Sequence, residues 1–155
     1  MERRHRVAVA LTAVIALTSV ASAVLGQSES PGSELTVVER ATTDAVVDIG
    51  GTGDTIGDIL AFGNDLYDAD NAEVVGRDQG SCIRTNPGSS WECTWTNLLD
   101  DGAITVQGPF PDSLEDSELA IIGGTGEYAS ATGTMTLHSR NEAGTEFDFT
   151  FHLGS

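Results

Sequence analysis

The feature that most limits the fold of this chain is a repeated alternation of apolar and polar residues. It is clearest near the end, where Phe147, Phe149, Phe151 and Leu153 alternate with polar residues. Because successive side chains of a strand point to opposite faces, this pattern predicts a strand with one buried face. With no convincing helical segment of ten or more residues, the strands predict an antiparallel barrel or a sandwich. The predicted strands cover residues 35–41, 46–49, 56–66, 74–85, 91–98, 103–110, 119–122, 132–138 and 145–153.

The first 26 residues have the pattern of a secretory signal peptide. A basic start precedes an apolar run from Val7 to Val20, and Ala21-Ser-Ala23 fits a signal peptidase site. We therefore expect a secreted protein, with a retained membrane anchor as the alternative. Residues 27–33 are expected to form a disordered linker, and residues 34–155 one barrel domain.

The chain is strongly acidic, with a formal net charge of −17 and no lysine. Cleavage after Ala23 would leave 4 basic and 23 acidic residues, a net charge of −19. Such a charge repels phosphate backbones and anionic bilayers. We expect no nucleic-acid partner and no membrane contact after signal cleavage.

The two cysteines, Cys82 and Cys93, flank a strong turn signal at Asn86-Pro-Gly-Ser89. If that turn closes a hairpin, Cys82 stands directly opposite Cys93, at a spacing that suits a disulfide. A disulfide also fits the expected secretion. Two ligands alone make a poor zinc site.

Other reactive patterns are weak. The glycine-rich stretch Gly123-Gly-Thr-Gly126 precedes a period-two segment rather than a helix, so it predicts a turn between strands and not a dinucleotide site. His138 and His152 fall on strands and are expected to be exposed. The loop carrying Asp65, Asp68, Asp70 and Glu73 suggests calcium, but it lacks the glycine and final glutamate of an EF-hand. We predict no metal site, and an acidic surface turn in its place.

Four sequence blocks, at residues 57–67, 75–82, 104–110 and 116–126, carry a resemblance to a known family. The chain resembles the allene oxide cyclase family, and more closely the bacterial secreted relatives of that family, which are grouped with dirigent proteins. The resemblance covers residues 35–153. It implies an all-β, calycin-like barrel of eight antiparallel strands with a largely apolar cavity. Plant cyclases of this family close the ring of a fatty-acid epoxide without a cofactor, and dirigent proteins steer phenolic intermediates. Plant relatives form trimers, so a homo-oligomer is possible.

The resemblance implies a set of ligand-binding residues. The cavity positions of the cyclase fall on Leu60, Phe62, Asn64, Cys82, Trp91 and Phe110. Period-two counting agrees that residues 60, 62 and 64 share one face. Phe110 stands where the plant enzymes have a tyrosine, and the disulfide would make Cys82 a stiffener of the wall. The stretch Val37-Val-Glu39 is similar to the family's acidic segment, so Glu39 is either a buried acid with a raised pKa or an exposed strand residue.

These observations predict a barrel that binds a small hydrophobic molecule and directs its stereoselective cyclisation or isomerisation, as a cofactor-independent isomerase would. In this interpretation Glu39 and Asn64 are the catalytic candidates, and Asn64 orients a polar group or a water molecule. A non-catalytic carrier and a surface protein with a solid core are the alternatives. The row of C-terminal phenylalanines fits a plain core or the wall of a cavity.

Overall fold

The computed structural model describes residues 32–154, which form ten strands and one short 3-10 helix, η1 (Gly126–Tyr128). The signal peptide and most of the linker predicted for residues 1–33 lie outside these described residues. No helix within residues 32–154 is long and apolar enough to cross a membrane. The strands are β1 (Ser33–Arg40), β2 (Ala45–Val47), β3 (Ile59–Phe62), β4 (Asp65–Tyr67), β5 (Val74–Asn86), β6 (Ser90–Leu99), β7 (Gly102–Pro111), β8 (Ser117–Gly124), β9 (Gly133–Ser139) and β10 (Glu146–Leu153).

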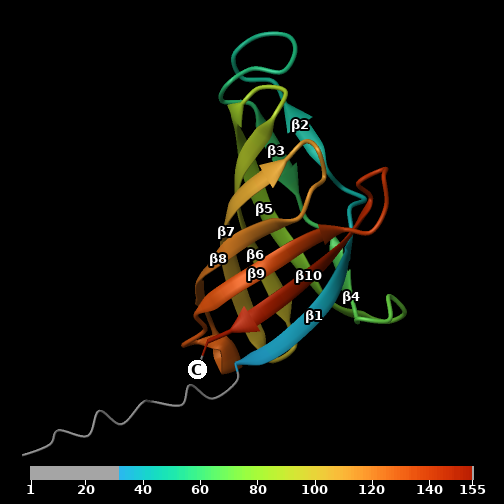
Figure 1. The fold of residues 1–155 in the computed structure, drawn as a ribbon, viewed down its shortest axis with the longest axis vertical. Coiled ribbons are helices and arrows are strands. Elements are labelled where there is room, and N and C mark those ends of the chain that lie inside the picture. Colours follow the sequence, from blue (N-terminus) through green and yellow to red (C-terminus); the bar gives the residue numbers. More distant parts are fainter. Residues whose placement is uncertain (1–31, 155) are drawn as a thin grey trace, which may run out of the picture.

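The strands close into an antiparallel barrel (Figure 1). From β5 the order runs through β6, β7, β8, β9, β10 and β1 to β4, and β4 pairs with β5 again. β3 and β4 both pair with β5 and are two parts of one wall strand, interrupted at Gly63 and Asn64. Counted this way, the barrel has the eight strands that the sequence predicts, and β2 adds a short outer pairing to β3.

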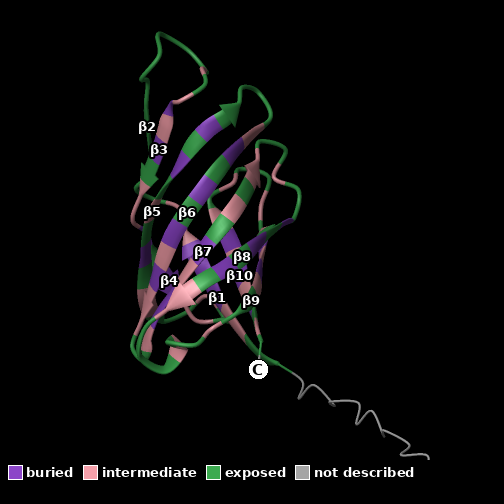
Figure 2. Cartoon of the chain, turned by 90° about the vertical axis from the view of Figure 1, so that its left-hand side faces the viewer, coloured by how far each residue is buried: buried purple, intermediate pink, exposed green. Residues whose placement is uncertain are grey.

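The interior is filled by the alternate residues that the sequence pattern marks as buried. Figure 2 shows buried and exposed bands alternating along the strands. Phe147, Phe149 and Phe151 are between 0% and 4% exposed, which confirms that this row faces inwards. The two strand histidines, His138 and His152, are exposed as expected.

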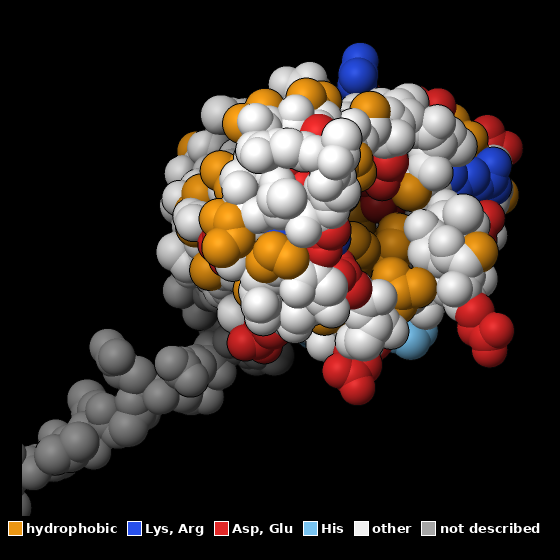
Figure 3. Space-filling view, turned by 90° about the horizontal axis from the view of Figure 1, so that it is seen from above, with side chains coloured by type: hydrophobic (Ala, Val, Ile, Leu, Met, Phe, Trp, Pro, Cys, Tyr) orange, Lys and Arg blue, Asp and Glu red, His pale blue; other side chains and the backbone are white. Residues whose placement is uncertain are grey.

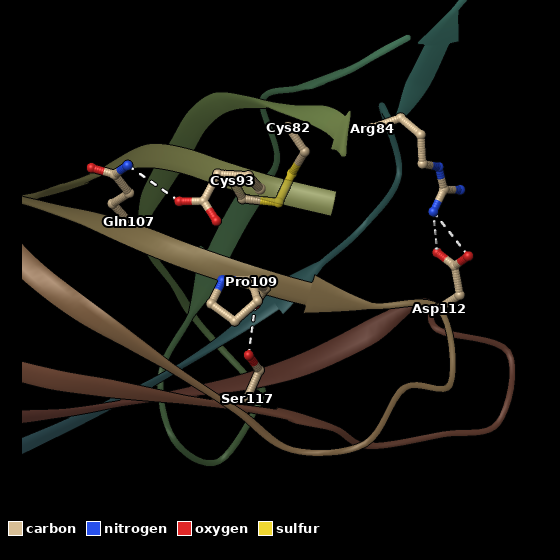
Figure 4. The surroundings of a disulfide bond; sticks show 8 residues. Cys82, Arg84, Cys93, Gln107, Pro109, Asp112 and Ser117 are labelled. Carbon is tan, nitrogen blue, oxygen red and sulfur yellow. Dashed lines mark hydrogen bonds and ion pairs between the residues drawn. A yellow bond between two sulfur atoms is a disulfide. The ribbon is translucent and has the colours of Figure 1, made fainter. Parts of the chain in front are cut away.

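The hairpin of β5 and β6 contains the predicted disulfide. Cys82 pairs with Cys93 across the two strands, and their sulfur atoms are bonded. Two residues further along β5, Arg84 also points inwards (Figure 4). Its guanidinium lies 3.8 Å from the centre of the Trp91 ring and donates to both carboxylate oxygens of Asp112, at 2.7 and 2.9 Å. The disulfide therefore ties the hairpin covalently, and the partly buried ion pair links β5 to the segment that follows β7.

The glycine-rich stretch at residues 123–126 ends β8 and leads through η1 into β9. The prediction of a turn between two barrel strands is confirmed. The three residues of η1 are too few to form the helix that a dinucleotide site needs.

Gly80 makes a testable contribution to the interior. It lies opposite Trp95, and a Cβ atom at this position would come within 2.3 Å of the Trp95 Cβ. We expect Gly80→Ala to lower the free energy of unfolding by about 1 to 3 kcal/mol, because the wall must shift to admit the methyl group. Denaturant unfolding measures this, with Gly123→Ala as control, since nothing lies within 4 Å of a Cβ there. Equal losses in the two variants would contradict the role of Gly80.

Candidate functional site

A pocket enters the barrel interior near the point where β1 leaves β10. Arg40 is the last residue of β1 paired with β10, and the chain then turns away so that β2 pairs with β3. Seen from this end, the molecule is hollowed, with hydrophobic and acidic side chains around the hollow (Figure 3). The part of the pocket that can take the centre of a water-sized molecule is about 30 Å³, and all the space between atoms, open mouth included, is about 350 Å³. Its lining consists of Glu39, Asp44, Leu60, Phe62, Cys82, Cys93, Trp95, Phe110, Leu137, Phe147 and Phe149.

Aromatic rings form most of the pocket wall. The ring centres of Phe62 and Trp95 are 5.9 Å apart in an edge-to-face arrangement, and Phe149 lies 5.5 Å from Trp95 on a tilted plane. Phe110 and Phe147 form a second edge-to-face pair at 5.8 Å. The indole Nε1 of Trp95 is buried without a hydrogen-bond partner among the described residues. The wall is thus apolar, with one unused donor.

Glu39 is held in this wall by Asn64. The Glu39 side chain is only 6% exposed, so the buried-acid interpretation is the one the structure supports. Asn64 Nδ2 donates to Glu39 Oε1 at 2.7 Å and to Asp44 Oδ1 at 2.9 Å. Its Oδ1 accepts hydrogen bonds from the backbone amides of Thr42 and Thr43, both at 2.9 Å. Asn64 therefore has no free amide hydrogen with which to orient a ligand.

Asp78 of β5 completes the acidic group. It is 0% exposed, and its Oδ1 accepts from the backbone amide of Asn64 at 2.8 Å. Its other oxygen, Oδ2, has no donor among residues 32–154. Burial, and next the negative charge of Asp78 and a hydrogen bond to it, raise the pKa of Glu39 well above the usual value of a glutamate. Burial also raises the pKa of Asp78. The two carboxyl groups together therefore hold a proton at pH values above the range in which carboxyl groups usually lose it. A protonated Glu39 can donate a hydrogen bond to Asp78.

The structure brings together most of the residues that the sequence singled out. Glu39, Leu60, Phe62, Cys82 and Phe110 line the pocket, and Asn64 lies behind Glu39. Trp91 points into the barrel but is not part of the lining, because it stacks on Arg84.

The sequence reasoning missed three residues of the pocket lining, Asp44, Trp95 and Leu137, and also Asp78, which lies behind Glu39. Asp78 lies four residues before Cys82 on the same strand, so the period-two pattern already places it inside. Trp95 shares the inward face of β6 with Cys93. Asp44 lies between β1 and β2, where no periodic signal exists.

The acidic loop considered for calcium has a different role. Asp68 Oδ1 accepts from the backbone amides of Ala72 and Glu73 and so caps its own turn. Within residues 32–154, no three His, Cys, Asp or Glu side chains are grouped so that they would hold a metal ion.

The raised pKa of Glu39 gives a prediction for stability. The folded state binds this proton more tightly than the unfolded state, so the free energy of unfolding falls as pH rises from the ordinary glutamate pKa to the folded-state pKa. Each pKa unit corresponds to about 1.4 kcal/mol. We expect Glu39→Gln, which mimics the protonated acid, to be more stable relative to wild type at pH 8 than at pH 4. Urea unfolding across this range measures the difference, with the exposed Glu118→Gln as control. A pH-independent difference for Glu39→Gln would show that its pKa is not raised.

Comparison with known proteins agrees with this geometry. The chain resembles a solved structure of a pyocyanin demethylase at 28% identity and a TM-score of 0.64, covering 76% of this chain and 98% of that one. It shares its fold with the pterocarpan synthase dirigent protein PsPTS1, at 17% identity, a TM-score of 0.65 and coverage of 82% and 98%. It also shares its fold with AbnU, an exo-specific intermolecular Diels-Alderase, at 15% identity, a TM-score of 0.58 and coverage of 80% and 100%.

The family comparison covers most of the barrel. Residues 51–153 match the family model described as dirigent-like protein. Glu39 and Asp44 precede the matched range, whereas Asn64 and Asp78 lie within it. The resemblance that the sequence blocks indicated is confirmed, and the chain belongs to the dirigent-like protein family.

Proposed function

We propose that this protein is a secreted barrel that binds a small hydrophobic molecule and directs its stereoselective cyclisation or isomerisation without a cofactor. The observation that carries the proposal is a buried glutamic acid, Glu39, in the wall of an otherwise largely apolar and aromatic pocket. Burial raises the pKa of this carboxyl group, and an acid that holds its proton above the usual pH range is suited to general acid catalysis. The disulfide fits an oxidising, extracellular location.

Shape supplies the first part of the mechanism. Leu60, Phe62 and Phe110 line the pocket and would hold a flexible substrate in one conformer, which lowers the barrier to ring closure and selects one stereochemical outcome. The Cys82–Cys93 bridge stiffens the same wall.

Proton transfer supplies the second part. Glu39 would donate its proton to an acceptor atom of the substrate, which leaves Glu39 and Asp78 both ionised, and it would then take a proton back from another atom of the substrate or from solvent, because repulsion by Asp78 favours the protonated form. Asn64 is a positioning residue in this scheme, because its amide fixes the Glu39 carboxyl and is itself saturated. The structural neighbours support small-molecule chemistry, since their names refer to demethylation of pyocyanin, pterocarpan synthesis and a Diels–Alder reaction.

Ligand binding is tested by tryptophan fluorescence of the purified protein, titrated with polyenes, phenolics and fatty-acid epoxide analogues. We expect saturable quenching in wild type and Trp91→Phe and none in Trp95→Phe, because Trp95 lines the pocket and Trp91 does not. A folded protein without a response to any ligand class would favour the solid-cored alternative.

Catalysis is tested by following the products of any bound ligand with chiral chromatography. We expect Glu39→Gln to retain binding while the rate of product formation falls by about 10²-fold or more, the usual contribution of a general acid. The exposed Glu118→Gln should leave both unchanged. Tight binding without product in the wild type would identify a carrier rather than an enzyme.

A further inference from the structure

The pocket combines aromatic rings with carboxyl groups and contains no basic side chain in its lining. Glu39 and Asp44 line it directly, and Asp78 lies behind Glu39. Ring faces carry negative electrostatic potential, so rings and carboxylates together form the usual environment for an organic cation. An ordinary hydrophobic pocket needs no carboxyl groups, since burying them is costly.

The nearby arginines do not neutralise this group. Arg40 donates from Nε to Asn71 Oδ1 at 2.9 Å, and Arg84 is bound to Asp112. Arg140, which follows the end of β9, donates to Asp148 at 2.6 Å in an exposed contact. Arg77, next to Asp78 in the chain, is exposed. Its positive charge lowers the pKa of Asp78, but this is the smallest of the effects that act on that pKa.

No fixed donor or basic group among the described residues satisfies one oxygen of Asp78, which leaves the Glu39 carboxyl as its neighbour. Asp78 is 0% exposed, yet its Oδ2 has no donor within the described part of the chain. The inward residues beside Glu39 on the other packed strands are uncharged, namely Leu66 on β4 and Phe147 and Phe149 on β10. These neighbours provide no positive charge, so among them only the proton that Glu39 and Asp78 hold reduces the negative charge of the pair.

We propose that the ligand of this pocket is a compact aromatic cation, and that its binding expels the proton shared by Glu39 and Asp78. This inference rests on the proposed function, because it specifies the charge of the molecule that the barrel binds. A cation stabilises the ionised pair, so its affinity rises as pH increases through the raised carboxyl pKa, and one proton is released on binding.

The test uses the purified full-length protein and three probes of similar size. 1-Methylquinolinium is permanently charged, 1-methylnaphthalene is its neutral counterpart, and 1-naphthoate is anionic. Because the quinolinium does not titrate, any pH dependence of its binding belongs to the protein. Binding is measured by isothermal titration calorimetry at pH 5 and pH 8 in 0.5 M salt. The salt screens the attraction between the cation and the acidic surface, because the Debye length falls from about 10 Å at 0.1 M to about 3 Å at 1 M.

We expect the quinolinium to bind about tenfold or more tightly than 1-methylnaphthalene at pH 8, a preference of about 1.4 kcal/mol. The preference should shrink at pH 5, and naphthoate should bind most weakly. Titrations in two buffers with different enthalpies of ionisation should reveal proton release. Glu39→Gln and Asp78→Asn should each reduce the preference and abolish the proton release, whereas Glu118→Gln should change neither.

The outcomes separate this inference from the proposed function. If the neutral probe binds as tightly as the cation and Trp95 responds to it, the cation inference is wrong while the hydrophobic pocket stands. If neither probe binds to the folded protein, both proposals fail for this ligand size. A cation preference that Glu118→Gln lowers as much as Glu39→Gln would assign it to the surface charge and overturn the inference.

Discussion

The barrel depends on the pairing of β5 along both of its edges. This strand of 13 residues pairs with β3 and β4 on one side and with β6 on the other, and these pairings close the sheet. Closure fixes which residues of β5 point inwards, because side chains alternate strictly along a strand. Asp78, Gly80, Cys82 and Arg84 therefore share the interior, whatever their individual polarity. Each of the charged members must then find its partners inside the barrel.

The two inward-facing charged residues of β5 are accommodated in different ways. Arg84 pairs with Asp112 and stacks on Trp91, so its charge is compensated by a carboxylate. Asp78 faces another acid, and the pair is accommodated by a proton rather than by a counter-charge. Burying two carboxyl groups in this way costs stability, and such costly arrangements are concentrated at functional sites. This contrast supports placing the chemistry at Asp78 and Glu39 and a structural role at Arg84.

Period-two reasoning predicted the part of the site that lies on regular strands. It placed Leu60, Phe62 and Cys82 on inward faces and set Cys82 opposite Cys93, because these properties follow from strand geometry alone. It did not distinguish Trp91 from Trp95, which share a face of β6. Their positions along the barrel axis differ, and that difference depends on the stagger of the neighbouring strands. The same alternation places Asp78 on the inward face of β5, but an aspartate carries no apolar signal of burial.

The contacts of the irregular segments were beyond such reasoning, and Asn64 shows why: period-two counting set it on the inward face but could not say what its side chain binds. It lies in the two-residue break between β3 and β4, and its side chain binds the segment that joins β1 to β2. A local pattern contains no signal for a contact between two interrupted strands. Yet this amide fixes the place where the first strand leaves β10, and thus the mouth of the pocket, while it also holds the carboxyl of Glu39. The opening and the acid are therefore positioned by one residue, so a change that moves the mouth also moves the proton donor.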